Sequence, residues 1–230
     1  MLRLVGFFLL VLVALHILRL VPIIGPIFDI PILGFWGAAI LISFVASRWA
    51  TTALDRRKLS RRVRELGHVE TPHNQGKLGS LYVGMKRYRA AVAPLERAVA
   101  GEPDVAEWRY RLGCALLGCR RPREAAAALE AAAAIDEEHA YGAVLMRLAQ
   151  ARLAIGDARG AVEALERRDR NHGPDAESAY RRGRALKALG RPDEARASLR
   201  EASRLAGSSA TFRRGEARKW AALAVLARVI

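Results

Sequence analysis

The segment YRLG at residues 110–113 recurs as YRRG at residues 180–183, and RPREA at residues 121–125 recurs as RPDEA at residues 191–195. In each case the second copy lies 70 residues after the first, a distance equal to two units of 34 residues plus an insertion of two. Such a period is typical of helical repeat proteins, in which each unit buries its apolar face against its neighbours. The sequence therefore predicts an all-α chain whose central part is a linear array of helix pairs.

Four units fit this spacing, at about residues 72–105, 106–141, 142–175 and 176–209. In each unit a small residue stands at the eighth and the twentieth position, where two antiparallel helices would approach closely. Large apolar residues recur at positions that fill the gap between neighbouring units. The first unit is the most complete, with Leu78, Gly79, Tyr82, Ala91, Leu95, Ala98 and Pro103 at the repeating positions.

These residues and their spacing resemble the tetratricopeptide repeat (TPR) family. The resemblance covers residues 72–207, and it implies an α-solenoid of about four TPR units whose concave groove binds a segment of another protein. Arg152, Arg168 and Arg182 depart from the family pattern, because they occupy positions that are normally apolar or small. We therefore expect the third and fourth units to be degenerate but to keep the helix–turn–helix shape.

Two apolar runs precede the repeats, at residues 4–18 and 30–46, with a cluster of prolines between them. Each run is close to the length that crosses a bilayer as a helix, and prolines end a helix where the chain must turn. The sequence therefore predicts a transmembrane hairpin at residues 1–50. A cleaved signal peptide is the competing interpretation, but it would have a shorter apolar run, a small-residue cleavage site and no second span.

The formal net charge is +15, and most of the surplus flanks the repeats. Residues 51–71 form a basic juxtamembrane linker after the second apolar run. The abundance of Ala, Arg and Gly indicates a bacterial source, and the positive-inside rule then predicts an inner-membrane protein with both termini in the cytoplasm. The cations expected to contact anionic lipid headgroups are Arg48, Arg56, Arg57, Lys58, Arg61 and Arg62.

The sequence shows no constellation of residues for catalysis, phosphate binding or metal binding, so we expect a protein that is not an enzyme and has no cofactor or metal. Cys114 and Cys119 are five residues apart on one expected helix and do not share a face, which disfavours a disulfide between them. Nucleic-acid binding is not expected either, because the basic stretches lack interleaved aromatic residues and the nearby membrane explains their position.

The TPR resemblance implies that the sixth residue of each unit lines the concave groove, and this residue is a cation in all four units. An acidic segment or a free carboxyl terminus of a partner matches such a row, because guanidinium groups bind carboxylates with paired hydrogen bonds. In the alternative interpretation, Glu107 and Glu177 neutralise the cations four residues further along their own helices. The predicted groove residues are Lys77, Arg111, Arg147, Arg181, Tyr110 and Tyr180.

A last helix is expected within residues 208–230, from about Ala210 to Val229, where it would cap the fourth unit. Residues 221–227 are apolar on nearly all sides, so contact with a partner, a second copy or the membrane is the alternative. As a whole, the sequence predicts a membrane-anchored TPR adaptor or scaffold that binds a protein partner at the cytoplasmic face. The alternative is a structural or assembly subunit of a membrane complex, held by the small-residue face of its hairpin at Gly34, Gly37, Ala38 and Ala39.

Overall fold

The computed structural model describes residues 70–209 and 214–229, together with residues 13, 40, 42–47, 49, 59 and 61–66 of the N-terminal part. The chain divides into two compact units, Met1–Arg64 and Glu65–Ile230. The described residues lie in helices and in the turns between them, and none of them is in a strand. The predicted all-α fold class is therefore confirmed for the described part of the chain.

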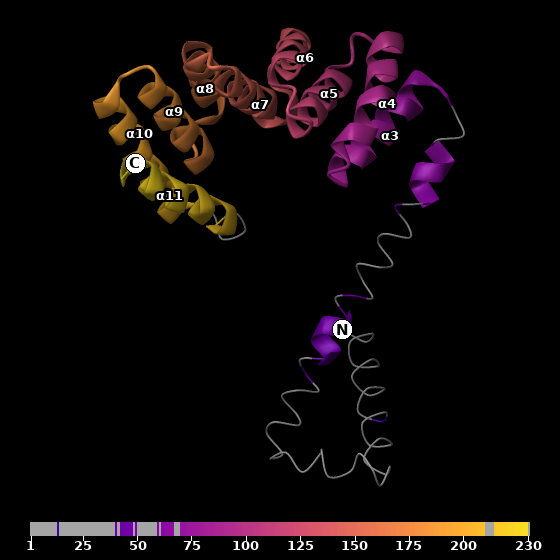
Figure 1. Ribbon diagram of the computed structural model, residues 1–230, viewed down its shortest axis with the longest axis horizontal. Helices are drawn as coiled ribbons and strands as arrows, with labels where there is room; N and C mark the ends of the chain where they lie inside the picture. The colour runs from indigo at the N-terminus through magenta and orange to yellow at the C-terminus, as the bar shows by residue number, and fades with distance from the viewer. Residues whose placement is uncertain are drawn as a thin grey trace. The chain divides into compact units, whose positions relative to one another are not determined.

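The second unit is an array of helix pairs followed by one further helix (Figure 1). Each pair corresponds to one of the four repeats that the sequence predicts, except that α7 begins three residues before the predicted third unit. The helices are α3 (Pro72–Gly84), α4 (Tyr88–Gly101), α5 (Ala106–Gly118), α6 (Pro122–Ile135), α7 (His139–Ile155), α8 (Ala158–His172), α9 (Ala176–Ala188), α10 (Pro192–Ser208) and α11 (Arg214–Val229).

The helix pairs follow one another along a curved row, as in an α-solenoid (Figure 1). Each first helix contacts the first helix of the next pair, in the order α3, α5, α7 and α9, and these contacts are more extensive than those between successive second helices. Elements on the inside of a curve lie closer together than those on its outside. The first helices therefore form the inner surface of the array, which is the surface that the TPR resemblance assigns to ligand binding.

Glycine at the eighth position allows the two helices of a pair to pack closely, as the sequence predicts. A Cβ atom added to Gly79, Gly113 or Gly183 would lie only 2.4, 2.4 and 2.7 Å, respectively, from the Cγ atom of a leucine on the second helix. Those leucines are almost completely buried. In the third unit the same position is Ala149, which is also fully buried.

The recurring RPxEA motif marks the start of the second helix in two units. Pro122 and Pro192 stand at the first helical position, where the missing N–H of proline is no loss. The preceding arginine donates two hydrogen bonds to the glutamate three residues later, at 2.7 and 2.5 Å from Arg121 to Glu124. The motif therefore initiates a helix at an exposed position and is not part of the inner surface.

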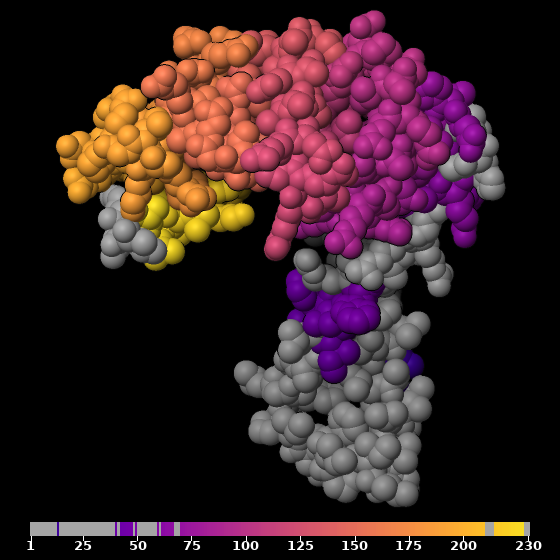
Figure 2. Space-filling view, turned by 45° about the horizontal axis from the view of Figure 1, so that its top comes forward, coloured from indigo at the N-terminus to yellow at the C-terminus, as the bar shows by residue number. Residues whose placement is uncertain are grey.

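Helix α11 covers the open end of the array, where it contacts α9 and α10 (Figures 1 and 2). Ala217 and Ala224 are buried against these helices, and Trp220 packs beside them. Its outer face exposes Val225 and Leu226, which retain 50% and 57% of their accessible surface. Packing against α9 and α10 therefore buries one face of α11, and the opposite face keeps an exposed apolar patch.

The predicted hairpin at residues 1–50 lies mostly outside the described residues, and so do its Arg48 and the linker residues Arg56, Arg57 and Lys58. The described residues between 40 and 49 are helical, and most of their large apolar side chains are exposed, including Phe44 and Trp49. Arg61 and Arg62 are exposed on a helical stretch. Among the helices that the structure describes, none combines the length and the apolar character that crossing a bilayer would require.

Candidate functional site

The inner surface brings three of the six predicted groove residues together. Tyr110 and Arg111 of α5 and Arg147 of α7 line one hollow of about 280 Å³, which Val83 and Tyr88 of the first unit also line. Tyr110 is 9% exposed, and the guanidinium carbon of Arg111 lies 5.5 Å from the centre of its ring. This hollow combines an aromatic wall with two guanidinium groups.

Arg111 and Arg181 form the intrahelical ion pairs that the sequence leaves open as an alternative. Arg111 Nε lies 2.6 Å from Glu107 Oε1, and Arg181 Nη2 lies 2.6 Å from Glu177 Oε1. Both pairs join residues four apart on one helix. The row of cations is therefore partly neutralised by acids of the array itself.

Helix α11 covers the predicted groove residues of the fourth unit. The ring of Trp220 lies 5.5 Å from that of Tyr180 and 5.0 Å from the guanidinium carbon of Arg181. The side chain of Arg181 is only 11% exposed. Tyr180 and Arg181 are thus less accessible to a partner than the sequence predicts, whereas Lys77 on α3 is exposed at the other end of the row.

Arg147 differs from the other arginines of the row because its own helix supplies no acid four residues earlier, where Ala143 stands. Its Nη1 atom donates a 2.9 Å hydrogen bond to the amide oxygen of Gln150, which is neutral. Within the described residues it forms no ion pair. Arg147 is therefore the inner-surface arginine whose charge is least compensated.

Burial and neighbouring charges adjust the titration of the groups around the hollow. Burial raises the pKa of the Tyr110 hydroxyl and of the Cys114 thiol, so both are neutral at physiological pH. Burial alone would also raise the pKa of Glu107, but hydrogen bonds and charges from Arg111 and His139 outweigh it and lower that pKa. Glu107 therefore stays ionised and keeps its partners.

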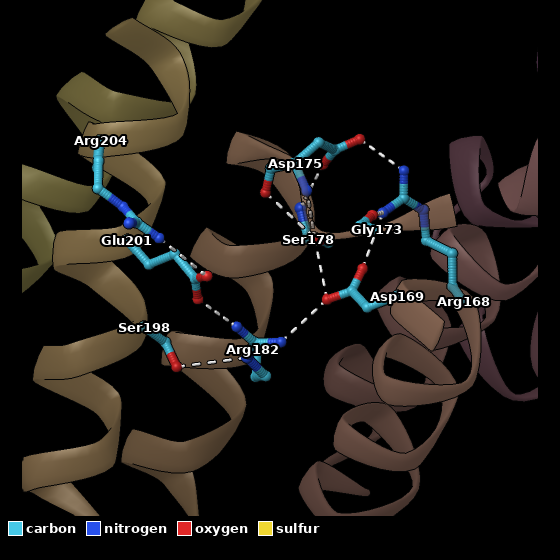
Figure 3. A network of polar contacts seen from close by, with 9 residues as sticks. All are labelled: Arg168, Asp169, Gly173, Asp175, Ser178, Arg182, Ser198, Glu201 and Arg204. Atoms are coloured by element: carbon cyan, nitrogen blue, oxygen red, sulfur yellow. Dashed lines mark hydrogen bonds and ion pairs between the residues drawn. The ribbon is translucent and has the colours of Figure 1, made fainter. Parts of the chain in front are cut away.

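The arginines that depart from the family pattern form a polar network between the third and fourth units, which sequence reasoning missed (Figure 3). Arg168, which is 8% exposed, donates to Asp169 at 2.8 Å and to Asp175 at 2.6 Å. Arg182 donates to the other oxygen of Asp169 at 2.9 Å and to Glu201 at 2.5 Å. The signal in the sequence was the presence of arginine where small or apolar residues are usual.

Arg152, the third departure, joins three helices in a similar way. Its guanidinium donates to Glu130 of α6 at 2.8 Å and to the backbone carbonyl of Gly160 in α8 at 3.0 Å. The degenerate positions therefore hold ion pairs between elements in place of apolar packing. In the part of the chain that the structure describes, no group of three or more His, Cys, Asp or Glu side chains could hold a metal ion.

Residues 176–208, which correspond to α9 and α10, match the family model described as tetratricopeptide repeat. The fourth helix pair is therefore similar in sequence to a TPR unit, and the three pairs before it repeat its helix–turn–helix architecture. No curated protein matches the sequence of the chain.

Several solved structures share the fold of the array. A crystal structure of the MamA protein is 21% identical, with a TM-score of 0.59 over 65% of this chain and 84% of that one. The MamA 41-end structure from Desulfovibrio magneticus RS-1 is 17% identical, with a TM-score of 0.61 over 73% of this chain and 96% of that one. At these identities the likeness shows a common fold alone, an α-solenoid of helix pairs.

Proposed function

We propose that the protein is a membrane-anchored TPR adaptor that holds a segment of a protein partner on the inner surface of its helix array. The observation that carries this proposal is the hollow in which Tyr110, Arg111 and Arg147 of successive units meet. Aromatic faces and guanidinium groups suit the side chains and carboxylates of an extended acidic segment or a carboxyl terminus. A scaffold of this kind binds its partner and catalyses no reaction.

The anchor in this proposal is the apolar hairpin at residues 1–50, placed in a bacterial inner membrane with both termini cytoplasmic. Its support is the exposure of Ile42, Phe44 and Trp49, which retain 51%, 54% and 76% of their accessible surface. Large apolar side chains on several sides of one helix suit a lipid environment better than water. Arg61, Arg62 and the other cations of the linker would then lie at the headgroups.

Reversing the charge of the hollow tests the groove. The double variant Arg111→Glu and Arg147→Glu should lose co-purifying proteins in mild detergent, because a carboxylate of the partner would meet two like charges. The matched control reverses Arg97 and Arg123, which are exposed on the second helices α4 and α6. Partner recovery that is equal in both variants would place binding on the hairpin or on α11, and would favour a structural subunit of a membrane complex.

A reporter fused after Ile230 tests the anchor. Cytoplasmic reporter activity together with resistance of the protein to carbonate extraction is the expected result. Alkaline phosphatase activity in the periplasm would contradict the orientation, and complete release into the carbonate supernatant would contradict the anchor.

A further inference from the structure

The connection between the second and third units contains the two residues by which the repeat exceeds 34, and it includes the first residues of α7, where that helix is kinked. Here the chain forms a left-handed turn, with φ values of 55° at Ala140, 57° at Tyr141 and 71° at Gly142. A residue other than glycine loses roughly 1–2 kcal/mol in this conformation. Tyr141 is nevertheless 88% exposed and therefore gains little from packing in the folded chain. Insertions in repeat proteins fall in loops on one face, which is often the binding face.

The strained turn is held in place from both sides. His139 Nε2 lies 2.5 Å from Glu107 Oε2 of α5, and Glu138 Oε2 lies 2.8 Å from His172 Nε2 of α8. A Cβ atom at position 142 would lie 2.6 Å from the His172 ring, so glycine is required there. Strain of this kind persists where the surrounding structure fixes it, and it is frequent at ligand sites.

The turn forms the wall of a hollow of about 570 Å³. Tyr141 stands on one side of it, Met146 of α7 also lines it, and Arg147 lines both this hollow and the smaller one described above. The hollow therefore places an exposed aromatic ring and an apolar side chain beside a guanidinium group.

The ionisable side chains that line this hollow are paired within the protein, with one exception among the described residues. Arg168 pairs with Asp175, His172 pairs with Glu138, and Glu177 accepts two hydrogen bonds from Arg181 at 2.9 and 2.6 Å. Arg147 attracts Glu177 electrostatically but bonds only the neutral side chains of Gln150 and Tyr110. A half-buried cation without an ion pair favours an anionic ligand, because a carboxylate restores the interactions that burial removes.

We infer that the turn at Ala140–Gly142 creates a specificity pocket, which takes a large apolar or aromatic side chain of the partner next to a carboxylate bound by Arg147. This inference rests on the proposed adaptor function and specifies the segment that the adaptor holds. The ring of Tyr141 stacks on the ligand side chain, and Arg147 fixes its position along the array. The carboxylate belongs either to an adjacent Asp or Glu side chain or to the end of the partner chain.

Two phage-displayed libraries of random 12-residue peptides test the inference on the full-length protein in detergent. One library carries the random segment within a chain, and the other carries it at a free carboxyl terminus, so the two distinguish the sources of the carboxylate. We expect enriched peptides to contain a large apolar or aromatic residue beside an acid or beside the free terminus. Fluorescent copies of these peptides should bind at least tenfold more weakly to Arg147→Gln, whereas Arg97→Gln should bind them normally.

Tyr141→Gly separates binding from folding, because glycine relieves the backbone strain while removing the ring. Thermal stability should stay equal or rise in this variant, and peptide affinity should fall severalfold. The inference would be overturned if the enriched peptides bound Tyr141→Gly and Arg147→Gln as tightly as they bind the unmodified protein. It would also be overturned if they lacked any carboxylate. If the double variant Arg111→Glu and Arg147→Glu no longer binds such peptides, the adaptor function stands without this pocket. Failure of both libraries to enrich any peptide also overturns the pocket, while the co-purification experiment still decides the adaptor function.

Discussion

At the scale of single residues, the glycines of α3 differ in what surrounds them. Gly79 faces the fully buried Leu95, whereas a Cβ atom at Gly84 would meet nothing within 4 Å. Gly79→Ala should therefore destabilise the array by roughly 1–3 kcal/mol through overpacking. Gly84→Ala, its matched control, should be neutral or stabilise by up to about 1 kcal/mol, because alanine favours the helix. Thermal denaturation of a fragment of residues 65–230 measures both, and equal effects would contradict the close approach of α3 and α4.

One position in the turn between the helices of each unit adopts a left-handed conformation. It is occupied by Lys86, Arg120, Gly156 and Gly190, with φ values of 58°, 61°, 88° and 70°. The backbone requirement is therefore the same in all four units, although only two of them have glycine. We infer that the other two units carry a conformational cost of roughly 1 kcal/mol each.

Exchanging residues at this position should change stability in opposite directions. Arg120→Gly should raise the melting temperature of the 65–230 fragment, and Gly190→Ala should lower it by the equivalent of about 1 kcal/mol. A Cβ atom at Gly190 would meet no neighbour within 4 Å, so the loss would come from the backbone alone. A decrease for Arg120→Gly would show that the arginine side chain contributes more than its conformation costs.

At the scale of helices, the interface between the third and fourth units depends on ion pairs. Asp169 has a side chain only 9% exposed and receives hydrogen bonds from Arg168 and Arg182 (Figure 3). Removing one partner of such a network leaves the other charges uncompensated in a region of low dielectric constant. Most buried apolar residues of the fourth unit and α11 also form clusters separate from the large cluster of the earlier units, although Ala185, Leu186 and Ala195 belong to that large cluster.

Asp169→Ala should therefore destabilise the array by roughly 2–3 kcal/mol. The matched control is Asp193→Ala. The Asp193 side chain lies 2.9 Å from Arg196 but is 93% exposed, so this substitution should change stability by less than about 0.5 kcal/mol. Hydrogen exchange should rise mainly in α9, α10 and α11, since neighbouring units in a repeat array unfold semi-independently. A uniform rise along α3–α11 would instead indicate that the array unfolds as one unit.

At the scale of the whole molecule, the two compact units expose different kinds of surface. The described residues at 40–49 expose Ile40, Ile42, Phe44 and Trp49, whereas α3–α10 bury most of their large apolar side chains. We expect the full-length protein to aggregate without detergent and the 65–230 fragment to remain in solution. Size-exclusion chromatography with light scattering measures both.

A fragment that dimerises, and becomes monomeric when Val225 and Leu226 are changed to Ser, would identify the outer face of α11 as a self-association surface.

The periodic spacing of glycine, alanine and leucine determined the helix pairs, their number and their close approach, because these features depend on residues near one another in the sequence and recur with every unit. The tertiary structure alone decided which charges remain available to a ligand. Arg182 meets Asp169 and Glu201, which are 13 and 19 residues away, and His139 meets Glu107 at a separation of 32. Trp220 covers Arg181 from a helix beyond the repeats. Compensation of a charge depends on which side chains the fold brings within a few ångströms, and a one-dimensional pattern does not contain those distances.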